Sequence, residues 1–464
     1  MVPASTNNNN NNNTKNEYLL SLHAVRESCF KVQEAAVKNK LQHFDIDTSK
    51  LQDMVQFVVS LIKRDYDDPS QIPSHGRWRH FDAGGRPRIQ TLINSWASLG
   101  IDATEQTRRV LDLFVVAVLL DIDPNQCYSF RETSTNRLYK KREGIAIAVL
   151  EMFMAGTFSI NPNQPHRVDS EALARLTIND LLQGFKTDTP STLIGLEDRF
   201  ELLKHLAQVI QRCPNYFGGE EGFVPRPGNM MGKVLIKGEE EEDYLLCHPT
   251  TIKTKKGPLI HLETLWPVVL EIGEIWTVED STFCKGGTFQ LGDVWPCAAL
   301  GDESKLVSFH KLSQWMVYSL IEPMEKLLGA MIEGTEQLTP LPDYSNGGLL
   351  IDTGFITLKN HDYERGIENY CENALLPGQP KVEVAPMFEM SDPVVVEWRA
   401  LTTAYLDLVA DRVRATFGMS KKVLSLTQLI EGGTTSAGRE LAEISRPNTQ
   451  EPPIVIKPDR RVIY

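Results

Sequence analysis

The chain has 464 residues, of which 41% are hydrophobic and 23% are charged, the composition of a globular protein with a large core. It carries 48 Lys and Arg against 61 Asp and Glu, a formal net charge of −13, whereas proteins that bind nucleic-acid backbones usually carry a basic surplus. The charge balance therefore argues against nucleic acid as the main partner, and it leaves room for a local basic pocket that holds one phosphate.

The cysteines and the apolar segments indicate where the protein resides. Seven cysteines without any CxxC spacing argue against a disulfide framework and a structural zinc site. No apolar signal segment follows Met1, and the longest apolar run, at 110–120, is about half as long as a membrane span. We therefore expect a cytoplasmic protein that holds no metal or other cofactor and contacts no membrane. The sequence leaves the oligomeric state open.

The predicted elements are mostly helices. Residues 1–16 contain a run of asparagines and predict a disordered tail, and 17–464 are expected to form one catalytic unit. Helical periodicity predicts helices at 17–66, 104–121, 143–155, 169–184, 195–212, 259–280, 308–333 and 393–417. Alternation at 233–248 and the closing segment 452–464 predict hairpins. We expect a mainly α, multi-helix globular fold with small β-hairpin elements, helical over 17–215 and mixed over 216–464.

The loop segment SHGRWRHF, residues 74–81, gathers cationic and aromatic side chains. Arg77 and Arg79 suit a phosphate or a carboxylate. Trp78 can stack on a planar group, and His80 adds a polar ring. The same residues can instead tie the loop to the core and neutralise the acids at 65–68.

The helix predicted at 308–333 opens with a polar face. Lys311, Gln314 and Tyr318 are spaced to lie on one side of it, and His310 precedes them. A lysine and a glutamine one turn apart make a polar wall that suits an anionic sugar. A solvated helix face gives the same pattern.

The segment LPDYSNGGLLIDTG, residues 341–354, carries two aspartates around a glycine pair. Asp343 lies between a proline and Tyr344, and the NGG run predicts a turn with positive φ. An acid fixed beside a proline has little orientational freedom, which suits a carboxylate that must face a reacting carbon. Asp352 is a second candidate acid, which can equally cap a helix or close an Asx-turn.

The segment EGGTTSAGRELA, residues 431–442, places a Gly-Gly pair before a helix that carries Arg439. Free N–H groups at a helix start bind anions, but such a segment can also simply begin a helix. The chain has no P-loop, GxSxG, HExxH or GxGxxG fingerprint.

Five segments, in chain order, resemble the pattern of the uracil catabolism protein 4 family of fungi and bacteria: SHGRWRHFDAGG, FHKLSQWMVYSLIEP, LPDYSNGGLLIDTG, EWRALT and EGGTTSAGRELA. The resemblance covers nearly the whole chain from about residue 17. The sequence departs from the pattern at Gly76, at Ser345, where the family usually has arginine, and at Asp343, where it often has glutamate. The resemblance implies a place in a pathway that degrades uracil by way of a ribosyl-urea to urea and a three-carbon acid.

The segments FHKLSQ and LPDYS are also similar to parts of queuosine-salvage nucleosidases. That likeness implies a DNA-glycosylase-like helical fold, with Lys311, Gln314 and Asp343 serving a nucleotide. Taken together, the two resemblances imply an enzyme that hydrolyses the N-glycosidic bond of a ribosyl-urea or its phosphate and releases urea. The alternatives are another hydrolase of the pathway, which acts on a uracil nucleotide or a ring-opened product, and a non-catalytic binding protein.

The implied reaction assigns expected roles to these residues. Asp343 would stabilise the positive charge that builds on C1′. Lys311 would hold the 5′-phosphate, with one of the two loop arginines as a possible partner, and Gln314 would bind the sugar or the urea. Either Asp352 or His310 would protonate the leaving urea.

Overall fold

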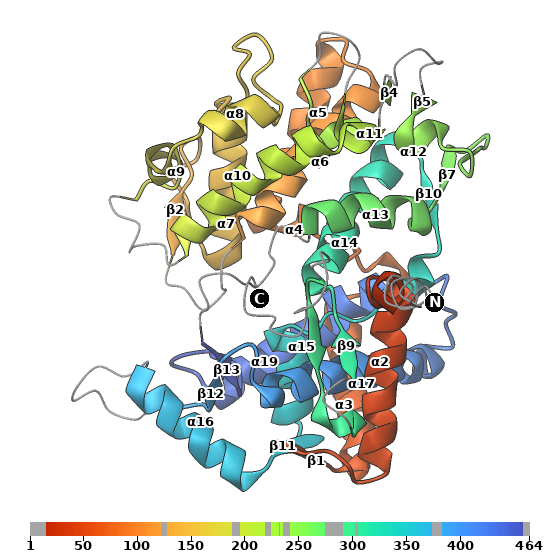
Figure 1. Ribbon diagram of the computed structural model, residues 1–464, viewed down its shortest axis with the longest axis vertical. Helices are drawn as coiled ribbons and strands as arrows, with labels where there is room; N and C mark the ends of the chain where they lie inside the picture. Colours follow the sequence, from red (N-terminus) through yellow and green to blue (C-terminus); the bar gives the residue numbers. More distant parts are fainter. Residues whose placement is uncertain are drawn as a thin grey trace, which may run out of the picture.

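The computed structural model describes residues 15–121, 128–187, 195–218, 224–231, 233–234, 242–273, 291–301, 305–373 and 383–457. Residues 1–14 of the predicted tail lie outside this part. Helices dominate the described residues, and the strands form sheets of two or three short members, so the predicted mainly α class is confirmed (Figure 1). No helix within the described ranges is long and apolar enough to cross a membrane.

The helices follow the chain from the first core element to the last turn before the C-terminal segment. They are α2 (Leu22–Val37), α3 (Leu51–Asp65), α4 (Trp78–Phe81), α5 (Arg88–Ser98), α6 (Ala103–Leu119), α7 (Lys141–Met154), α8 (Ser170–Arg175), α9 (Ile178–Gly184), α10 (Leu196–Arg212), α11 (Pro214–Phe217), α12 (Tyr244–Cys247), α13 (Leu262–Gly273), α14 (Lys311–Leu328), α15 (Tyr344–Asp352), α16 (Asn360–Asn373), α17 (Pro393–Phe417), α18 (Leu426–Leu429) and α19 (Thr435–Ser445). A π-helical turn, Ile430–Thr434, joins α18 to α19.

The strands are short and pair locally or across long stretches of chain. They are β1 (Phe44–Ile46), β2 (Ser129–Arg131), β3 (Leu138–Lys140), β4 (Lys233–Val234), β5 (Glu242–Asp243), β6 (Ile252–Lys253), β7 (Pro258–His261), β8 (Val294–Pro296), β9 (Leu306–Ser308), β10 (Met331–Glu333), β11 (Ile356–Leu358), β12 (Met387–Phe388) and β13 (Val455–Ile456). The sheets pair β1 with β11, β2 with β3, β4 with β5, β8 with β9 and β12 with β13, and order the remaining three as β10-β7-β6.

The two predicted hairpins have different outcomes. Strands β4 and β5 pair antiparallel, as expected for the hairpin at 233–248, whose tip lies outside the described residues. In the predicted C-terminal hairpin, the described strand β13 pairs in parallel with β12. Residues 458–464 lie outside the described part.

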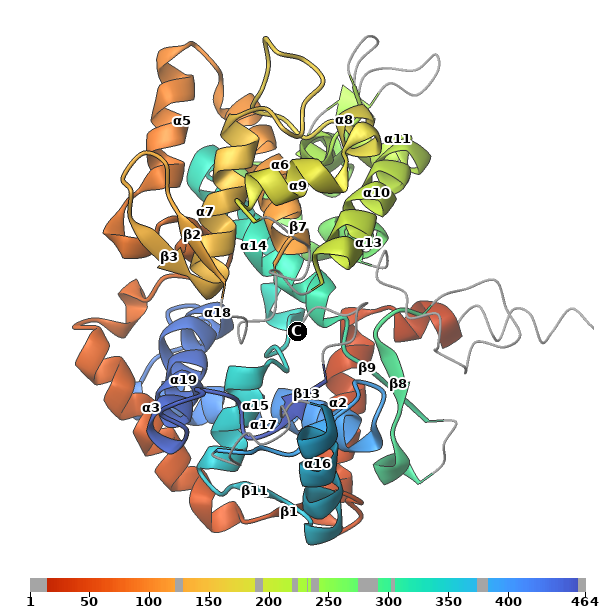
Figure 2. The same cartoon turned by 90° about the vertical axis from the view of Figure 1, so that its left-hand side faces the viewer.

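The hydrophobic side chains form two main cores. The first is built by helices α4 to α11, α13 and α14 and fills the upper half of the molecule in both views (Figures 1 and 2). The second is built by α2, α3, α15 and α17 with residues of α18 and α19, and fills the lower half. In the second core, the early helices α2 and α3 pack with the late helix α17.

Local sequence signals account well for the longest helices. Asp102 accepts a hydrogen bond from the N–H of Glu105 and begins α6, whose apolar run is buried. Asp392 caps α17, Pro393 occupies its first turn, and Gly418 ends it with a φ of 66°. These boundaries are the ones the sequence indicates.

Helix α15 packs closely against both α19 and α17 because glycines lie at the two contacts. A Cβ on Gly438 would lie 1.9 Å from the carbonyl oxygen of Ser345, and one on Gly347 would lie 2.7 Å from the ring of Trp398. The turn with positive φ predicted for the NGG run is therefore wrong, since these residues are helical and none has a positive φ. The glycines permit close packing, and this packing fixes the start of α15.

Candidate functional site

A cavity lies at the edge of the first core, which contributes Trp315 and Leu341, and it reaches Asp343, whose chain neighbour Tyr344 belongs to the second core. It is lined by His75, Asp121, Arg142, Lys311, Leu312, Trp315, Leu341 and Asp343. The structure thus brings together Asp343 and Lys311, two residues that the sequence predicted for one site.

Asp343 is positioned by the start of α15. It is the N-cap residue, and its Oδ1 accepts a hydrogen bond from the N–H of Asn346 at 2.8 Å. The half-buried side chain faces the cavity, and the cap occupies only one of its two oxygens. The capping bond and the close α15–α19 crossing restrict the orientation of this carboxylate.

Lys311 is the first residue of α14, and its side chain is buried. Burial lowers its pKa from 10.5 to about 8, while the negative charges of Asp343 and Asp121 favour the ammonium form. Arg142 and Arg399 act in the same direction as burial. The lysine is therefore a cation whose charge depends on the nearby carboxylates.

A second carboxylate, Asp121, lies in the same cavity between two arginines. Its Oδ2 is 3.1 Å from Nη1 of the fully buried Arg77 and 3.5 Å from Nε of Arg142. Burial lowers the pKa of Arg77, and Asp121 opposes that change. Sequence reasoning missed Asp121 and Arg142. The end of the apolar helix and the basic run YKKRE at 139–143 were the available signals, but neither indicated that the two meet.

His75 forms the third polar side of the cavity and was also missed as a site residue. Its Nδ1 lies 2.5 Å from Oε2 of Glu431, in the π-helical turn, and its ring lies 4.8 Å from that of Trp315. Burial raises the pKa of Glu431, but the hydrogen bond and charge of His75, with the nearby arginines, bring it below its usual value. The cluster SHGRWRHF contained the histidine, yet its partner comes from a segment far along the chain.

An outer cleft adjoins the cavity, and Arg142 lines both. The cleft encloses about 1260 Å³ and the inner pocket about 360 Å³, both with their open mouths included. Its lining is His80, Lys140, Lys141, Arg142, Glu143, Tyr344, Ser345, Gly348, Gly438, Arg439, Ala442, Glu443, Gln450, Pro452 and Pro453. Four Lys and Arg side chains against two Glu give this cleft a positive excess in an acidic protein.

Three predicted binding residues lie in this cleft. Tyr344 and Arg439 line it from α15 and α19, and His80 lines it from α4. Nη1 of Arg77 donates to Nδ1 of His80 at 3.1 Å, which leaves the His80 proton on Nε2. Burial, followed by the charges of Arg77 and Arg142, holds the pKa of His80 well below its usual value. His80 is therefore a neutral polar group beside the cations.

The expected anion site at the start of a helix after Gly432-Gly433 is wrong in its geometry. The π-helical turn continues directly into α19, so residues 432–435 lie inside a continuous helical segment rather than at its free end. Arg439 contributes through its side chain in the cleft.

Gln314 and His310, the other predicted residues near the start of α14, form hydrogen bonds inside the core. Nε2 of Gln314 donates to the carbonyl of Phe309 and to Thr339 Oγ1, and its Oε1 accepts from the Thr339 N–H at 2.8 Å. Nε2 of the buried His310 donates to the carbonyl of Leu19 at 2.8 Å. Neither residue lines the cavity. The face of α14 that meets the cavity carries Lys311, Leu312 and Trp315. The predicted face carried Lys311, Gln314 and Tyr318.

Three further predicted residues lie elsewhere. Nε1 of Trp78 donates to Asp82 at 2.9 Å, and the Trp78 ring packs in the first core. Arg79 forms an ion pair with Glu322. The two oxygens of Asp352 accept from Arg446 at 2.9 and 2.6 Å. The structure therefore does not bring these residues to Asp343.

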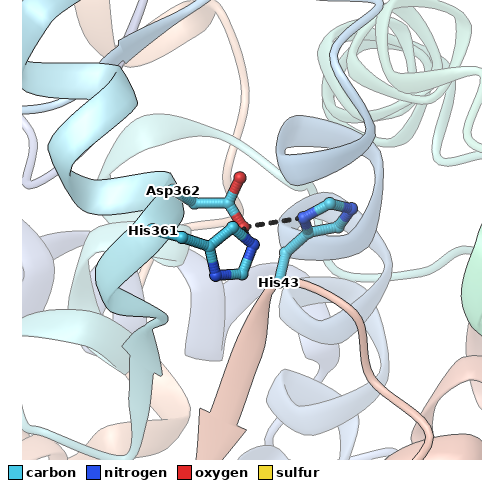
Figure 3. Close-up of side chains that lie close together, drawn as sticks. All are labelled: His43, His361 and Asp362. Carbon is cyan, nitrogen blue, oxygen red and sulfur yellow. Dashed lines mark hydrogen bonds and ion pairs between the residues drawn. The ribbon is translucent and has the colours of Figure 1, made fainter.

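A separate group of His43, His361 and Asp362 places its nitrogen and oxygen atoms within 4.8 Å of one another (Figure 3). His43 Nδ1 lies 2.9 Å from Asp362 Oδ2, and Asp362 Oδ1 accepts from Arg365 at 2.9 Å. A metal ion would have to share this carboxylate with a guanidinium. His361 is 68% exposed. The group is better explained as a tie between the segment before β1 and the start of α16.

The fold and the cavity define a mainly α protein with paired carboxylates and cations in one pocket. A family model described as "Protein of unknown function (DUF1688)" matches residues 18–463, and the chain belongs to this family. It is 34% identical over 458 residues to "Uracil catabolism protein 4" of Lachancea kluyveri, covering 96% of this chain and 98% of the relative. It is 33% identical over 447 residues to "Protein urg3" of Schizosaccharomyces pombe, covering 95% and 97%.

Proposed function

We propose that this protein acts in uracil and pyrimidine catabolism as a hydrolase that cleaves the N-glycosidic bond of a ribosyl-urea or its phosphate. The name of the L. kluyveri relative supports the pathway, because the identity extends over nearly the full length of both chains. The observation that carries the reaction is the oriented carboxylate of Asp343 in a cavity that also holds Lys311. We also propose, as part of this function, that the chain is related to queuosine-salvage nucleosidases and shares their DNA-glycosylase-like fold.

The proposed chemistry needs a negative group next to the anomeric carbon. As the bond between C1′ and nitrogen breaks, positive charge develops on C1′ and the ring oxygen. A carboxylate held in a partly dry cavity stabilises this charge more strongly than water does. Asp343 performs this role in the proposal and orients the attacking water. Lys311 lies in the same cavity as Asp343 and places a positive charge near it.

In this proposal the cations of the outer cleft bind the 5′-phosphate, a role that the sequence assigned to Lys311. With the pentose C1′ at Asp343, the rest of the ligand extends toward Arg142, which lines both spaces. Arg439 and Lys141 line the cleft beyond it. Arginine forks and lysine ammonium groups are the common partners of phosphate oxygens.

The test is to incubate the purified protein with ribosyl-urea, with its 5′-phosphate and with a uracil nucleotide, and to assay urea and free pentose. Release of urea and pentose in equal amounts from either ribosyl-urea substrate is the expected result. Turnover of the uracil nucleotide alone would instead favour a different hydrolase of the pathway. Binding of these compounds without any turnover would favour a non-catalytic protein.

A further inference from the structure

The proposed hydrolysis requires a proton donor, and the residues predicted for it lie elsewhere. Urea leaves poorly as an anion, so its nitrogen must gain a proton as the bond to C1′ breaks. Asp352 is held by the two terminal nitrogens of the Arg446 guanidinium, and His310 is buried against Leu19. Neither side chain lines the cavity that holds Asp343.

His75 has the geometry that this step needs. It lines the cavity, and its side chain is only 7% exposed. Because Nδ1 faces Glu431 at 2.5 Å, the opposite ring nitrogen, Nε2, is the one available to a ligand. The ring packs against the Trp315 ring at 4.8 Å, and the backbone N–H of His75 donates to the carbonyl oxygen of Thr427 at 3.1 Å.

Glu431 is placed for this contact by an unusual backbone. It lies in the π-helical turn between α18 and α19, a rare conformation that recurs at functional sites. The turn packs tightly, since a Cβ on Gly432 would lie 2.8 Å from the side chains of Ile72 and Tyr66. A carboxylate on Nδ1 fixes the histidine tautomer and stabilises the imidazolium, the pairing found in many acid–base sites.

We propose that His75, positioned by Glu431, is the general acid of the site and protonates the leaving nitrogen of the urea; this inference rests on the proposed function. The bond between C1′ and nitrogen breaks, its electron pair goes to the nitrogen, and that nitrogen takes the proton from His75 Nε2. Water adds its oxygen to C1′ and transfers a proton to the Asp343 carboxylate. That proton returns to His75 through solvent, so that ribosyl-urea and water yield ribose and urea.

Charged groups face His75 from several elements. The cavity presents Lys311 from α14, Arg142 from α7, Asp121 after α6 and Asp343 before α15. His80 from α4 lies near enough to interact with it electrostatically, and Arg79 and Arg439 act on its partner Glu431. The experiment therefore compares variants at each pH instead of relying on a single profile.

The test compares two substrates that differ only in the leaving group: ribosyl-urea and p-nitrophenyl ribofuranoside, whose phenolate leaves without a proton. In H75N we expect kcat on ribosyl-urea to fall about 10²- to 10⁴-fold, with the basic limb of the pH profile lost. Turnover of the nitrophenyl substrate should remain within about threefold of wild type, because it needs no general acid. E431Q should give a smaller loss on ribosyl-urea.

H43N is the matched control, because His43 also pairs through Nδ1 with a carboxylate but lies outside the cavity. It should leave both activities unchanged. Thermal melts of each variant separate unfolding from a chemical effect, and H75Q provides a second substitution if H75N does not fold. An equal loss on both substrates, or an unchanged basic limb in a folded His75 variant, would overturn the inference while leaving the hydrolase proposal intact. Failure of the wild-type protein to release urea would overturn both.

Discussion

Helix α15 carries an aspartate at each end, and the two have different surroundings. Asp343 caps the N-terminus with one oxygen and lines the cavity with Lys311. Asp352, the last residue, is 6% exposed and gives both oxygens to Arg446. Two acids from one short segment thus serve different purposes. A carboxylate held by a two-pronged guanidinium stabilises the structure, whereas one that a single N–H holds can also face a substrate.

D343N tests Asp343, the aspartate that lines the cavity, and should have the largest effect on activity. Asparagine still caps a helix, so the fold should persist, but the negative charge near C1′ is lost. We expect kcat for urea release to fall by on the order of 10³-fold or more. Steady-state kinetics with D352N as the control would measure this. Near-normal turnover in a folded D343N protein would remove Asp343 from the reaction.

At the other end of α15, a substitution of Asp352 should lower the stability of the protein and leave its activity unchanged. D352A leaves the part-buried Arg446 guanidinium without its carboxylate, which costs about 1–3 kcal/mol of unfolding free energy. Chemical denaturation would measure the loss, and kcat at 25 °C should stay near the wild-type value. A D352A protein that is fully stable but inactive would reverse the roles assigned to the two aspartates.

Lys311 and Arg446, the cations beside the two aspartates, should contribute differently to stability as the pH changes. Burial lowers the pKa of Lys311 to about 8, so at neutral pH the folded protein holds a charge that burial disfavours. Between about pH 8 and the unfolded value of 10.5 the unfolded state binds more protons, and this contribution to stability rises with pH. K311M should therefore gain stability relative to wild type at pH 7, on the order of 1 kcal/mol, and this gain should shrink toward pH 10. Denaturation at several pH values would measure it, with an R446M series as the contrast that shows no such trend.

The smallest expected effect concerns the outer cleft. R439A removes an exposed cation of the cleft and should raise KM for the phosphorylated substrate about threefold to fivefold, as expected for a partly screened charge. The unphosphorylated substrate should be unaffected. R64A, which removes an exposed arginine paired with Glu440 outside the cleft lining, serves as the control. Equal KM changes for both substrates would argue against a phosphate in this cleft.

The candidate site was predictable in part. Asp343 and Lys311 carried local signals, an acid after a proline and a polar residue at a helix start, and the structure places both at one cavity. Gln314 carried the same kind of signal but bonds to Thr339 within the core. Helical spacing indicates which residues share a face, but it does not indicate whether that face meets a cavity or a neighbouring segment.

The sequence by itself determined the mainly helical class and the ends of helices such as α17, because caps, prolines and terminal glycines act within a few residues. Tertiary structure decided the rest. It made the NGG run a packing surface against Trp398, joined His75 to Glu431 and set Asp121 beside Arg142. These contacts join residues far apart in the chain, and their energies depend on burial and on the approach of whole helices, which no local pattern encodes.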